Sequence, residues 1–282
     1  MAKTYSRSGV AALLLCALIP RLAWSQTPSP LPEWQYSAGI ILSKLFEPNL
    51  PDWFRVVGGA VETQPVYAGA SAYEVQAGPA ITILYKDIAF ISTGDGIGVN
   101  LLRGDHYRAG VALAYDLGRR ESEDYTNLRG LGNISPAPAA KVFASYVLSK
   151  KFPLVLRVDA RQILGGVNGT VGDVGFYMPL PGSSRKFVMF AGPTATFATH
   201  RYLQSEFGVT RSQSRTSGRP IFTTHSGIES VGAGFTATRF LSVHWLVNVD
   251  LGISKFKGSA QSSPLTESTT QREAALSVDY QW

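Results

Sequence analysis

The chain has 282 residues, the length of one large domain or two ordinary ones, and its formal net charge is +6. Charged residues make up only 16% of the chain and aromatic residues 11%, and Lys and Arg form no cluster interleaved with stacking aromatics, which excludes a nucleic-acid-binding surface. The single cysteine excludes a disulfide framework, and no spacing of Cys, His or carboxylates predicts a metal or cofactor site.

The first 25 residues are expected to form a cleaved secretory signal peptide. Two basic residues precede an apolar run at 10–19, and the segment 23–25 supplies a small-x-small cleavage site. The run is much shorter than the roughly 20 apolar residues of a membrane-spanning helix. Residues 26–33 then read as a proline-rich periplasmic linker, and residues 34–282 as one domain.

From position 34 onward, twelve segments rich in Val, Ile, Tyr and Phe alternate with Gly, Pro, Asn and Asp, which predicts an all-β chain. Most of them are far longer than the strands of soluble proteins, which usually have about 5–6 residues, and a tilted membrane strand needs about 9–11. The segment 88–102 is interrupted by glycines, which we expect to be strand glycines or a bulge. The predicted strands are 34–46, 54–66, 74–85, 88–102, 105–117, 138–149, 153–165, 171–180, 186–199, 228–239, 242–256 and 271–282.

The last predicted strand has an apolar face and a polar face. Its apolar residues are Leu276, Val278, Tyr280 and Trp282, and the residues between them are polar. In a bilayer the apolar face meets lipid, the polar face meets the lumen, and the terminal aromatics suit the headgroup level. A strand that lies on a soluble sandwich core is the alternative interpretation.

The predicted connections alternate in length. Tight turns at 103–104, 149–152 and 181–185 contrast with long loops at 118–137, 200–227 and 257–270. Outer-membrane barrels place short turns and both termini on the periplasmic side and long loops outside. The sequence therefore predicts a closed transmembrane antiparallel β-barrel of about twelve strands in the lipid of an outer membrane, with a soluble exported sandwich as the alternative.

Several predicted strands carry charged residues on the face that would point into the barrel. Two interpretations stay open: these residues line a narrow pore that selects charged or zwitterionic solutes, or they pair with one another and fill the lumen. No nucleophile at a recognisable elbow accompanies the histidines, so no catalytic residue is predicted. The candidate lumen-lining residues are Arg108, Asp116, Arg157, Asp159, Arg161, His244 and Asp250.

Several segments resemble the family of MltA-interacting protein and outer-membrane protein V (MipA/OmpV). They lie at 65–71, 78–85, 117–120, 128–132 and 202–210, and their order and spacing together carry the likeness. It covers most of the chain after about position 55, and the predicted strand at 34–46 is an addition to the family pattern. The family-like positions are Tyr67, Gly69, Tyr202, Phe207, Gly208, Val209, Thr210, Ser217 and Gly218.

The resemblance implies a non-enzymatic outer-membrane barrel that acts as an interaction protein. Its founding member is associated as a scaffold with a lytic murein transglycosylase and a murein polymerase, and the barrel-assembly machinery is expected to recognise the C-terminal aromatic strand. A murein hydrolase or synthase is therefore the expected partner. A narrow channel, or adhesion through the long outer loops, are the alternatives.

The segment 202–217 has two interpretations. It forms a partner-binding or gating loop, or Tyr202 and Phe207 anchor the loop at the membrane rim. The second is the favoured interpretation.

Overall fold

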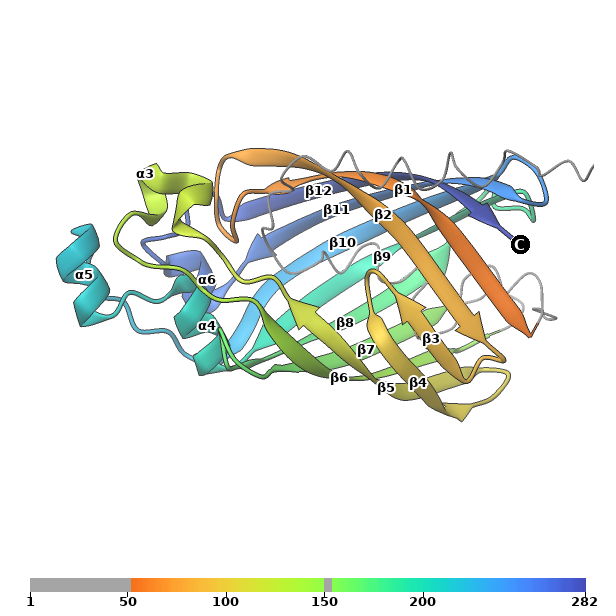
Figure 1. The fold of residues 1–282 in the computed structure, drawn as a ribbon, viewed down its shortest axis with the longest axis horizontal. Coiled ribbons are helices and arrows are strands. Elements are labelled where there is room, and N and C mark those ends of the chain that lie inside the picture. The colour runs from red at the N-terminus through yellow and green to blue at the C-terminus, as the bar shows by residue number, and fades with distance from the viewer. Residues whose placement is uncertain (1–51, 150–153) are drawn as a thin grey trace, which may run out of the picture.

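The computed structural model describes residues 52–149 and 154–282, in which twelve antiparallel strands close into one barrel (Figure 1). Each strand pairs with its neighbours in sequence, and β1 (Trp53–Pro65) pairs with β12 (Thr270–Gln281) to close the ring. The predicted fold class is confirmed. The other strands are β2 (Tyr73–Tyr85), β3 (Ala89–Ser92), β4 (Gly96–Arg103), β5 (Tyr107–Asp116), β6 (Ala137–Val147), β7 (Val155–Ile163), β8 (Thr170–Pro179), β9 (Phe187–Ala198), β10 (Gly227–Phe240) and β11 (Trp245–Phe256).

Side chains alternate between the outside and the inside of this wall, as the period of two in the sequence requires. In β5 and β6 nearly every second residue is buried, and the residues between them are mostly exposed. In β12 the outward residues Leu276 and Val278 are about half exposed, whereas Asp279 between the outward positions is fully buried. A closed ring leaves no free sheet edge at its seam, because β1 and β12 pair over eight residues.

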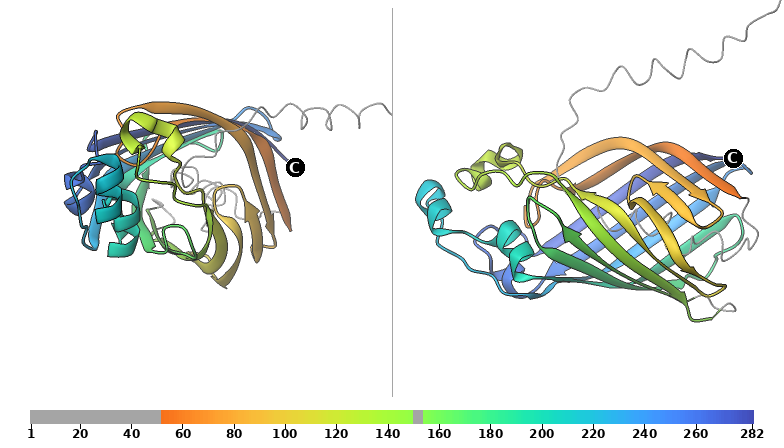
Figure 2. Two further views of the ribbon diagram at one scale, coloured as in Figure 1. Left: turned by 60° about the vertical axis from the view of Figure 1, so that its left-hand side comes forward. Right: turned by 60° about the horizontal axis from the view of Figure 1, so that its bottom comes forward.

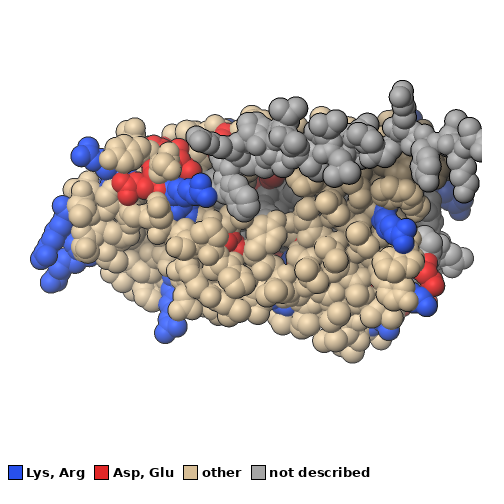
Figure 3. Space-filling model, in the orientation of Figure 1, with Lys and Arg blue, Asp and Glu red and all other residues tan. Residues whose placement is uncertain are grey.

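Two girdles of exposed aromatic residues flank an apolar band on the outer surface. In β2, Tyr73 and Tyr85 are twelve residues apart, about 40 Å along the strand, or roughly 30 Å along the axis of a barrel whose strands tilt by about 45°. This height suits the hydrocarbon core of a bilayer. Charged side chains gather at the two ends in Figure 3, and the band between them is largely uncharged. Exposed aromatics at the end where β1 begins and β12 stops are Trp53, Tyr107, Tyr146, Trp245 and Trp282.

The prediction that 88–102 forms one strand is wrong. The segment folds into the hairpin of β3 and β4, which pair from Ala89 with Val99 to Ser92 with Gly96. Gly96 has φ of +82°, and a Cβ there would lie 2.1 Å from the backbone oxygen of Leu113. A glycine is therefore required at this tight turn, where any other residue would be strained and would collide with the neighbouring strand.

This hairpin supplies two of the twelve strands. The predicted strand 34–46, the signal peptide 1–25 and the linker 26–33 all lie outside the described residues, and described residues alone complete the ring.

The two ends of the barrel differ in the length of their connections. Short turns such as 86–88, 104–106 and 241–244 lie at the end where β1 begins and β12 stops. The long loops 117–136, 199–226 and 257–269 lie at the other end and carry all the helices of the described residues (Figures 1 and 2). None of the helices within 52–149 and 154–282 is long and apolar enough to cross a membrane. The helices are the 3-10 helix η4 (Glu121–Asp124), α3 (Tyr125–Leu128), α4 (His200–Phe207), α5 (Arg211–Ser217) and α6 (Gly258–Ser262).

Candidate functional site: the barrel interior and the loop cap

Most of the predicted lumen-lining residues lie on the inner face of the barrel. Arg108, Asp116, Arg157, Arg161 and Asp250 are all buried, and each occupies the inward register of its strand. Asp159 also lies on the inward register of β7 and is partly buried. The interior is therefore charged, as the alternation predicts.

His244 does not line the lumen, so its predicted position is wrong. β11 begins at Trp245, three residues later than the predicted start at position 242, and His244 lies in the exposed turn 241–244. Its ring stacks on Tyr280 at a centroid distance of 5.3 Å, and its Nδ1 lies 3.0 Å from the backbone oxygen of Gln281. In the sequence the alternation of apolar and polar residues continues from β11 into the turn, so the pattern alone does not show where the strand begins.

Several charges of the interior are paired, one pair between β6 and the turn that joins β3 to β4, and one between the neighbouring strands β7 and β8. Nζ of Lys141 lies 2.6 Å from Oδ1 of Asp95, and both side chains are almost completely buried. An Arg161 guanidinium nitrogen lies 2.6 Å from Oδ2 of Asp173, whose other carboxylate oxygen accepts a hydrogen bond from Thr196. These pairs support the interpretation that some of the lumen charges compensate one another. Lys141 and Asp95 are not among the predicted lumen-lining residues, although Lys141 stands on the polar face of an alternating strand.

The outer face of the C-terminal strand ends in packed aromatic rings. Tyr280 lies edge-to-face against Trp282 at 4.9 Å and against Trp245 at 5.2 Å. Leu276, Val278 and Trp282 remain exposed on the lipid-facing side. The strand therefore presents the apolar, aromatic-ended surface that the sequence predicts.

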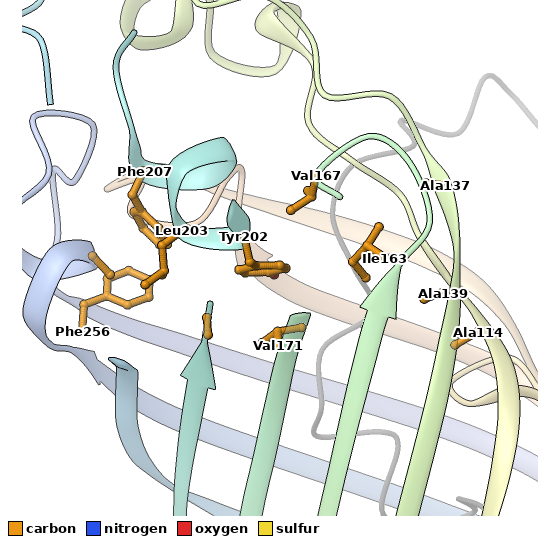
Figure 4. Close-up of a cluster of buried hydrophobic side chains, with 12 residues drawn as sticks. Ala114, Ala137, Ala139, Ile163, Val167, Val171, Tyr202, Leu203, Phe207 and Phe256 are labelled. Atoms are coloured by element: carbon orange, nitrogen blue, oxygen red, sulfur yellow. The ribbon is translucent and has the colours of Figure 1, made fainter. Parts of the chain in front are cut away.

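At the other end, α4 packs across the inner wall of the barrel. Leu203 and Phe207 are fully buried and Tyr202 nearly so, and Phe207 lies edge-to-face against Phe256 at 5.2 Å. Figure 4 shows Tyr202 and Leu203 directed from α4 toward the ends of the strands. We call this group the mouth cluster; its members are Ala114, Ala137, Ala139, Ile163, Val167, Val171, Ala198, Tyr202, Leu203, Phe207, Phe256 and Ala260.

Tyr202 and Phe207 thus point toward the barrel interior and not outward to lipid. Both side chains hold the long loop 199–226 in place, but they hold it over the mouth of the barrel and not at the lipid-facing rim. Burial is also the main cause that raises the pKa of the Tyr202 hydroxyl well above its ordinary value. The hydroxyl therefore stays protonated at neutral pH.

A second apolar group joins four loops above the mouth. Tyr67 is buried there, and its hydroxyl donates a hydrogen bond of 3.1 Å to the backbone oxygen of Leu265. We call it the loop cluster; its members are Val66, Tyr67, Ala70, Leu128, Leu131, Val209 and Leu265. The members of the loop cluster come from the loops after β1, β5, β9 and β11, so their packing joins four loops at this end of the barrel. The two clusters with their loops form what we call the loop cap.

Backbone hydrogen bonds reinforce the loop cap. The backbone oxygen of Gly69, in a residue with φ of +103°, accepts hydrogen bonds from the N–H groups of Glu267 at 2.8 Å and Ser268 at 3.0 Å. The hydroxyl of Ser263 donates to the backbone oxygen of Phe207 at 2.6 Å. The loops are therefore held by directional bonds as well as by apolar packing.

α5 is a short helix with defined ends that docks onto another loop. Thr210 begins it in a capping box with Gln213, and Gly218, in the left-handed conformation, ends it. The Gln213 side-chain amide donates a hydrogen bond of 2.7 Å to the backbone oxygen of Leu131. The hydroxyl of Ser217 donates to the backbone oxygen of Gln213 at 2.6 Å.

All the family-like positions thus meet in the loop cap, although the sequence separates them by up to 151 residues, from Tyr67 to Gly218. Gly208 ends α4, where a Cβ would lie 1.9 Å from the side-chain nitrogen of Gln204. The sequence analysis recognised these residues but not their convergence. The signal in the sequence that could have predicted this convergence is the presence of apolar residues inside otherwise polar loops.

Charged groups lie around α4 within the cap. A guanidinium nitrogen of Arg119 donates a hydrogen bond of 2.7 Å to the backbone oxygen of Glu206. Burial raises the pKa of the Glu206 carboxyl to about 7; the Asp116 and Glu123 carboxylates raise it further, and the Arg119 charge lowers it. Glu206 therefore changes its charge near neutral pH.

The described residues contain no group of three or more His, Cys, Asp or Glu side chains that would hold a metal ion. The arrangement offers packing surfaces, paired charges and a closed wall.

A family model described as MltA-interacting protein MipA matches residues 57–282. No curated protein matches the chain.

Three solved structures are distantly similar. The NanC porin is 11% identical over 80% of this chain and 98% of its own, with a TM-score of 0.41. The CymD monoaromatic hydrocarbon channel is 8% identical over 89% and 96%, with a TM-score of 0.43. An anion-selective porin from Comamonas acidovorans is 8% identical over 82% and 98%, with a TM-score of 0.37.

Proposed function

Because the chain belongs to the family of MltA-interacting protein MipA, we propose that it is a non-enzymatic outer-membrane barrel that holds murein machinery at the membrane. The partner we propose is a murein hydrolase or synthase. The family description supports a partner of this class. The single structural observation that carries the proposal is the loop cap, because loops that pack over the mouth of a barrel favour an anchor over an open pore.

The barrel supports an outer-membrane location through its apolar band and aromatic girdles. In that membrane the short turns and both ends of the ring face the periplasm, where murein lies. The turn 241–244 and the neighbouring Trp282 are exposed at this end, and we propose this surface for the partner. The loop cap would then face outward.

Site-specific crosslinking tests the proposal. A photo-crosslinking residue placed at His244, in the exposed periplasmic turn, should capture a murein hydrolase or synthase from intact envelopes. The matched variant carries the same residue at the exposed Arg211 of α5, on the opposite end, and should capture none. Recovery of no murein enzyme from either position would overturn the proposal.

A gated channel is the second candidate, and the charged interior favours it. A barrel filled only for stability gains little from buried charges, because ion pairs taken out of water repay their desolvation poorly. On this proposal the loop cap is the gate. Planar-bilayer recordings should show no conductance for the wild type and stepwise conductance after the mouth cluster is disrupted; no conductance in either would exclude the channel.

A further inference from the structure

Three basic residues lie on the outer face of β11 and β12, at the end of the barrel that carries the loop cap. Lys255 and Arg272 are exposed on the outward registers of these two strands, which lie side by side in Figure 1. Lys257 is partly exposed and follows the buried, inward-facing Phe256. Its backbone is extended, with φ of −132°, so it continues the alternation outward. We call these three side chains the rim cations.

The rim cations are close enough together to act on one headgroup. Lys255 stands directly opposite Thr270 in the strand register, so Arg272, two residues further along β12, is its diagonal neighbour. Diagonal neighbours in an antiparallel pair lie about 7–8 Å apart, and two residues along a strand span about 7 Å, which is the step from Lys255 to Lys257. The long side chains of Lys and Arg can therefore converge on one anionic group.

The rim cations lie near the level of the outer aromatic girdle. The backbone N–H of Arg272 donates a hydrogen bond of 3.1 Å to the hydroxyl of Tyr73, which belongs to that girdle. Below them the outward registers are apolar, and Ile253 of β11 and Leu276 of β12 are each about half exposed. In a bilayer the girdle marks the headgroups, and acyl chains meet Ile253 and Leu276.

The ion pairs and cation–ring contacts of residues 52–149 and 154–282 include none of the rim cations. Two outward-facing arginines at the opposite end of the barrel do have ring partners. The guanidinium of Arg55 lies 4.9 Å from the ring centre of Trp53, and that of Arg239 lies 5.9 Å from the ring centre of Phe187. The rim cations therefore differ from other outward-facing bases in being open to a partner.

Carboxylates near the rim cations are directed elsewhere. In the loop between β11 and β12, the exposed carboxylate of Glu267 accepts hydrogen bonds from both the backbone N–H and the hydroxyl of Ser71. The outer face around the rim cations is therefore positive and favours an anionic partner from outside the protein. The acids of β1, β11 and β12 all stand on inward registers; they are Glu62, Asp250, Glu273 and Asp279.

We propose that the rim cations bind the phosphate groups of lipid A, the membrane anchor of the lipopolysaccharide that forms the outer leaflet of an outer membrane. Phosphate oxygens accept charge-assisted hydrogen bonds from Lys and Arg, and the planar guanidinium of Arg272 can donate two of them to one phosphate. The acyl chains of the same molecule would cover Ile253 and Leu276. The proposal rests on the orientation that places the loop cap outside, and it does not depend on the murein partner.

The site also connects the lipid to the loop cap. Lys257 is the N-cap residue of α6, and Ala260 of that helix is fully buried in the mouth cluster. A lipid that holds the side chain of Lys257 therefore also holds the base of the loop 257–269.

Thermal unfolding of the refolded barrel in a neutral detergent tests the site, because a folded barrel migrates differently from an unfolded one on an unheated gel. The probe is purified lipid A at physiological ionic strength, where weak surface attraction is screened beyond about 8 Å. We expect saturating lipid A to raise the unfolding midpoint of the wild type by roughly 5–10 °C. Lipid A stripped of its phosphates, and phosphatidylglycerol, should each produce a much smaller rise.

Variants separate this site from general attraction of lipid to the barrel. The double variant Lys255→Gln with Arg272→Gln should fold, because both side chains are exposed, and should lose the lipid A shift. The matched double variant Arg55→Gln with Arg239→Gln removes two outward charges from the opposite end and should keep the shift. Lys257→Gln alone should reduce the shift, and it decides the matter if the first double variant fails to fold.

Several results would overturn the proposal. They are no shift in the wild type, an equal shift with phosphate-free lipid A or with phosphatidylglycerol, or a full shift that survives in both the Lys255 and Arg272 double variant and Lys257→Gln. None of these results bears on capture of a murein enzyme at the periplasmic turn, so the two proposals fail separately.

Discussion

Removal of the Phe207 ring should open the loop cap and leave the barrel intact. Phe207 is fully buried in the mouth cluster, with its ring 5.2 Å from that of Phe256. Replacing a buried phenylalanine by alanine typically costs about 3–5 kcal/mol. The strands keep their ladder bonds in this variant, so the cost falls on docking of the loop. The population of opened cap should therefore rise by roughly a hundred-fold to a few thousand-fold.

Limited trypsin digestion of the folded barrel measures this opening. Arg211 and Arg215 lie in the loop 199–226, so cleavage there reports the opened state. The Phe207→Ala variant should be cut in this loop far faster than the wild type and should still run as a folded barrel. Phe197→Ala, on the half-exposed outer face of β9, is the control and should digest at the wild-type rate. Equal digestion of Phe207→Ala and wild type would refute the packing account of the cap.

Three further predictions concern charge, insertion and backbone geometry. Burial raises the pKa of Glu206 from 4.5 to about 7, so the closed cap holds an extra proton in that window. The free energy of opening the loop cap should therefore fall by at most about 3 kcal/mol as pH rises from 4.5 to 7. Trypsin should cut the wild-type loop faster over this range, whereas the digestion rate of Glu206→Gln should not depend on pH in this way. Deleting Trp282 should lower the amount of heat-modifiable barrel in the outer membrane, and an unchanged amount would contradict its role in insertion. Gly96→Ala should lower the unfolding midpoint clearly, because its Cβ meets backbone at positive φ, whereas Gly59→Ala, with open space on the outer face, should change it little.

The wall of the barrel was predictable because its signal is local. Alternation from Leu276 to Trp282 fixes which side chains face lipid, and the same period places Arg157 and Asp250 inside. The signal fails where the period of two runs through a turn. Thr93 to Asp95 form a turn of three residues inside an alternating segment, and His244 continues the pattern of β11 into a turn.

The loop cap was not predictable from local pattern. Tyr67, Leu128 and Leu265 lie in three separate loops, and nothing in their neighbourhoods says that they touch. Their contact depends on the register of the whole barrel, which brings the loops after β1, β5 and β11 to one end.

Single-channel recording in planar bilayers tests the central claim, that the loop cap closes this barrel, most directly. The wild-type protein at neutral pH should insert and show no stable conductance steps, whereas Phe207→Ala should show steps or at least brief openings. Frequent large steps in the wild type would contradict the account, because they would mean that the packed loops leave the mouth of the barrel open.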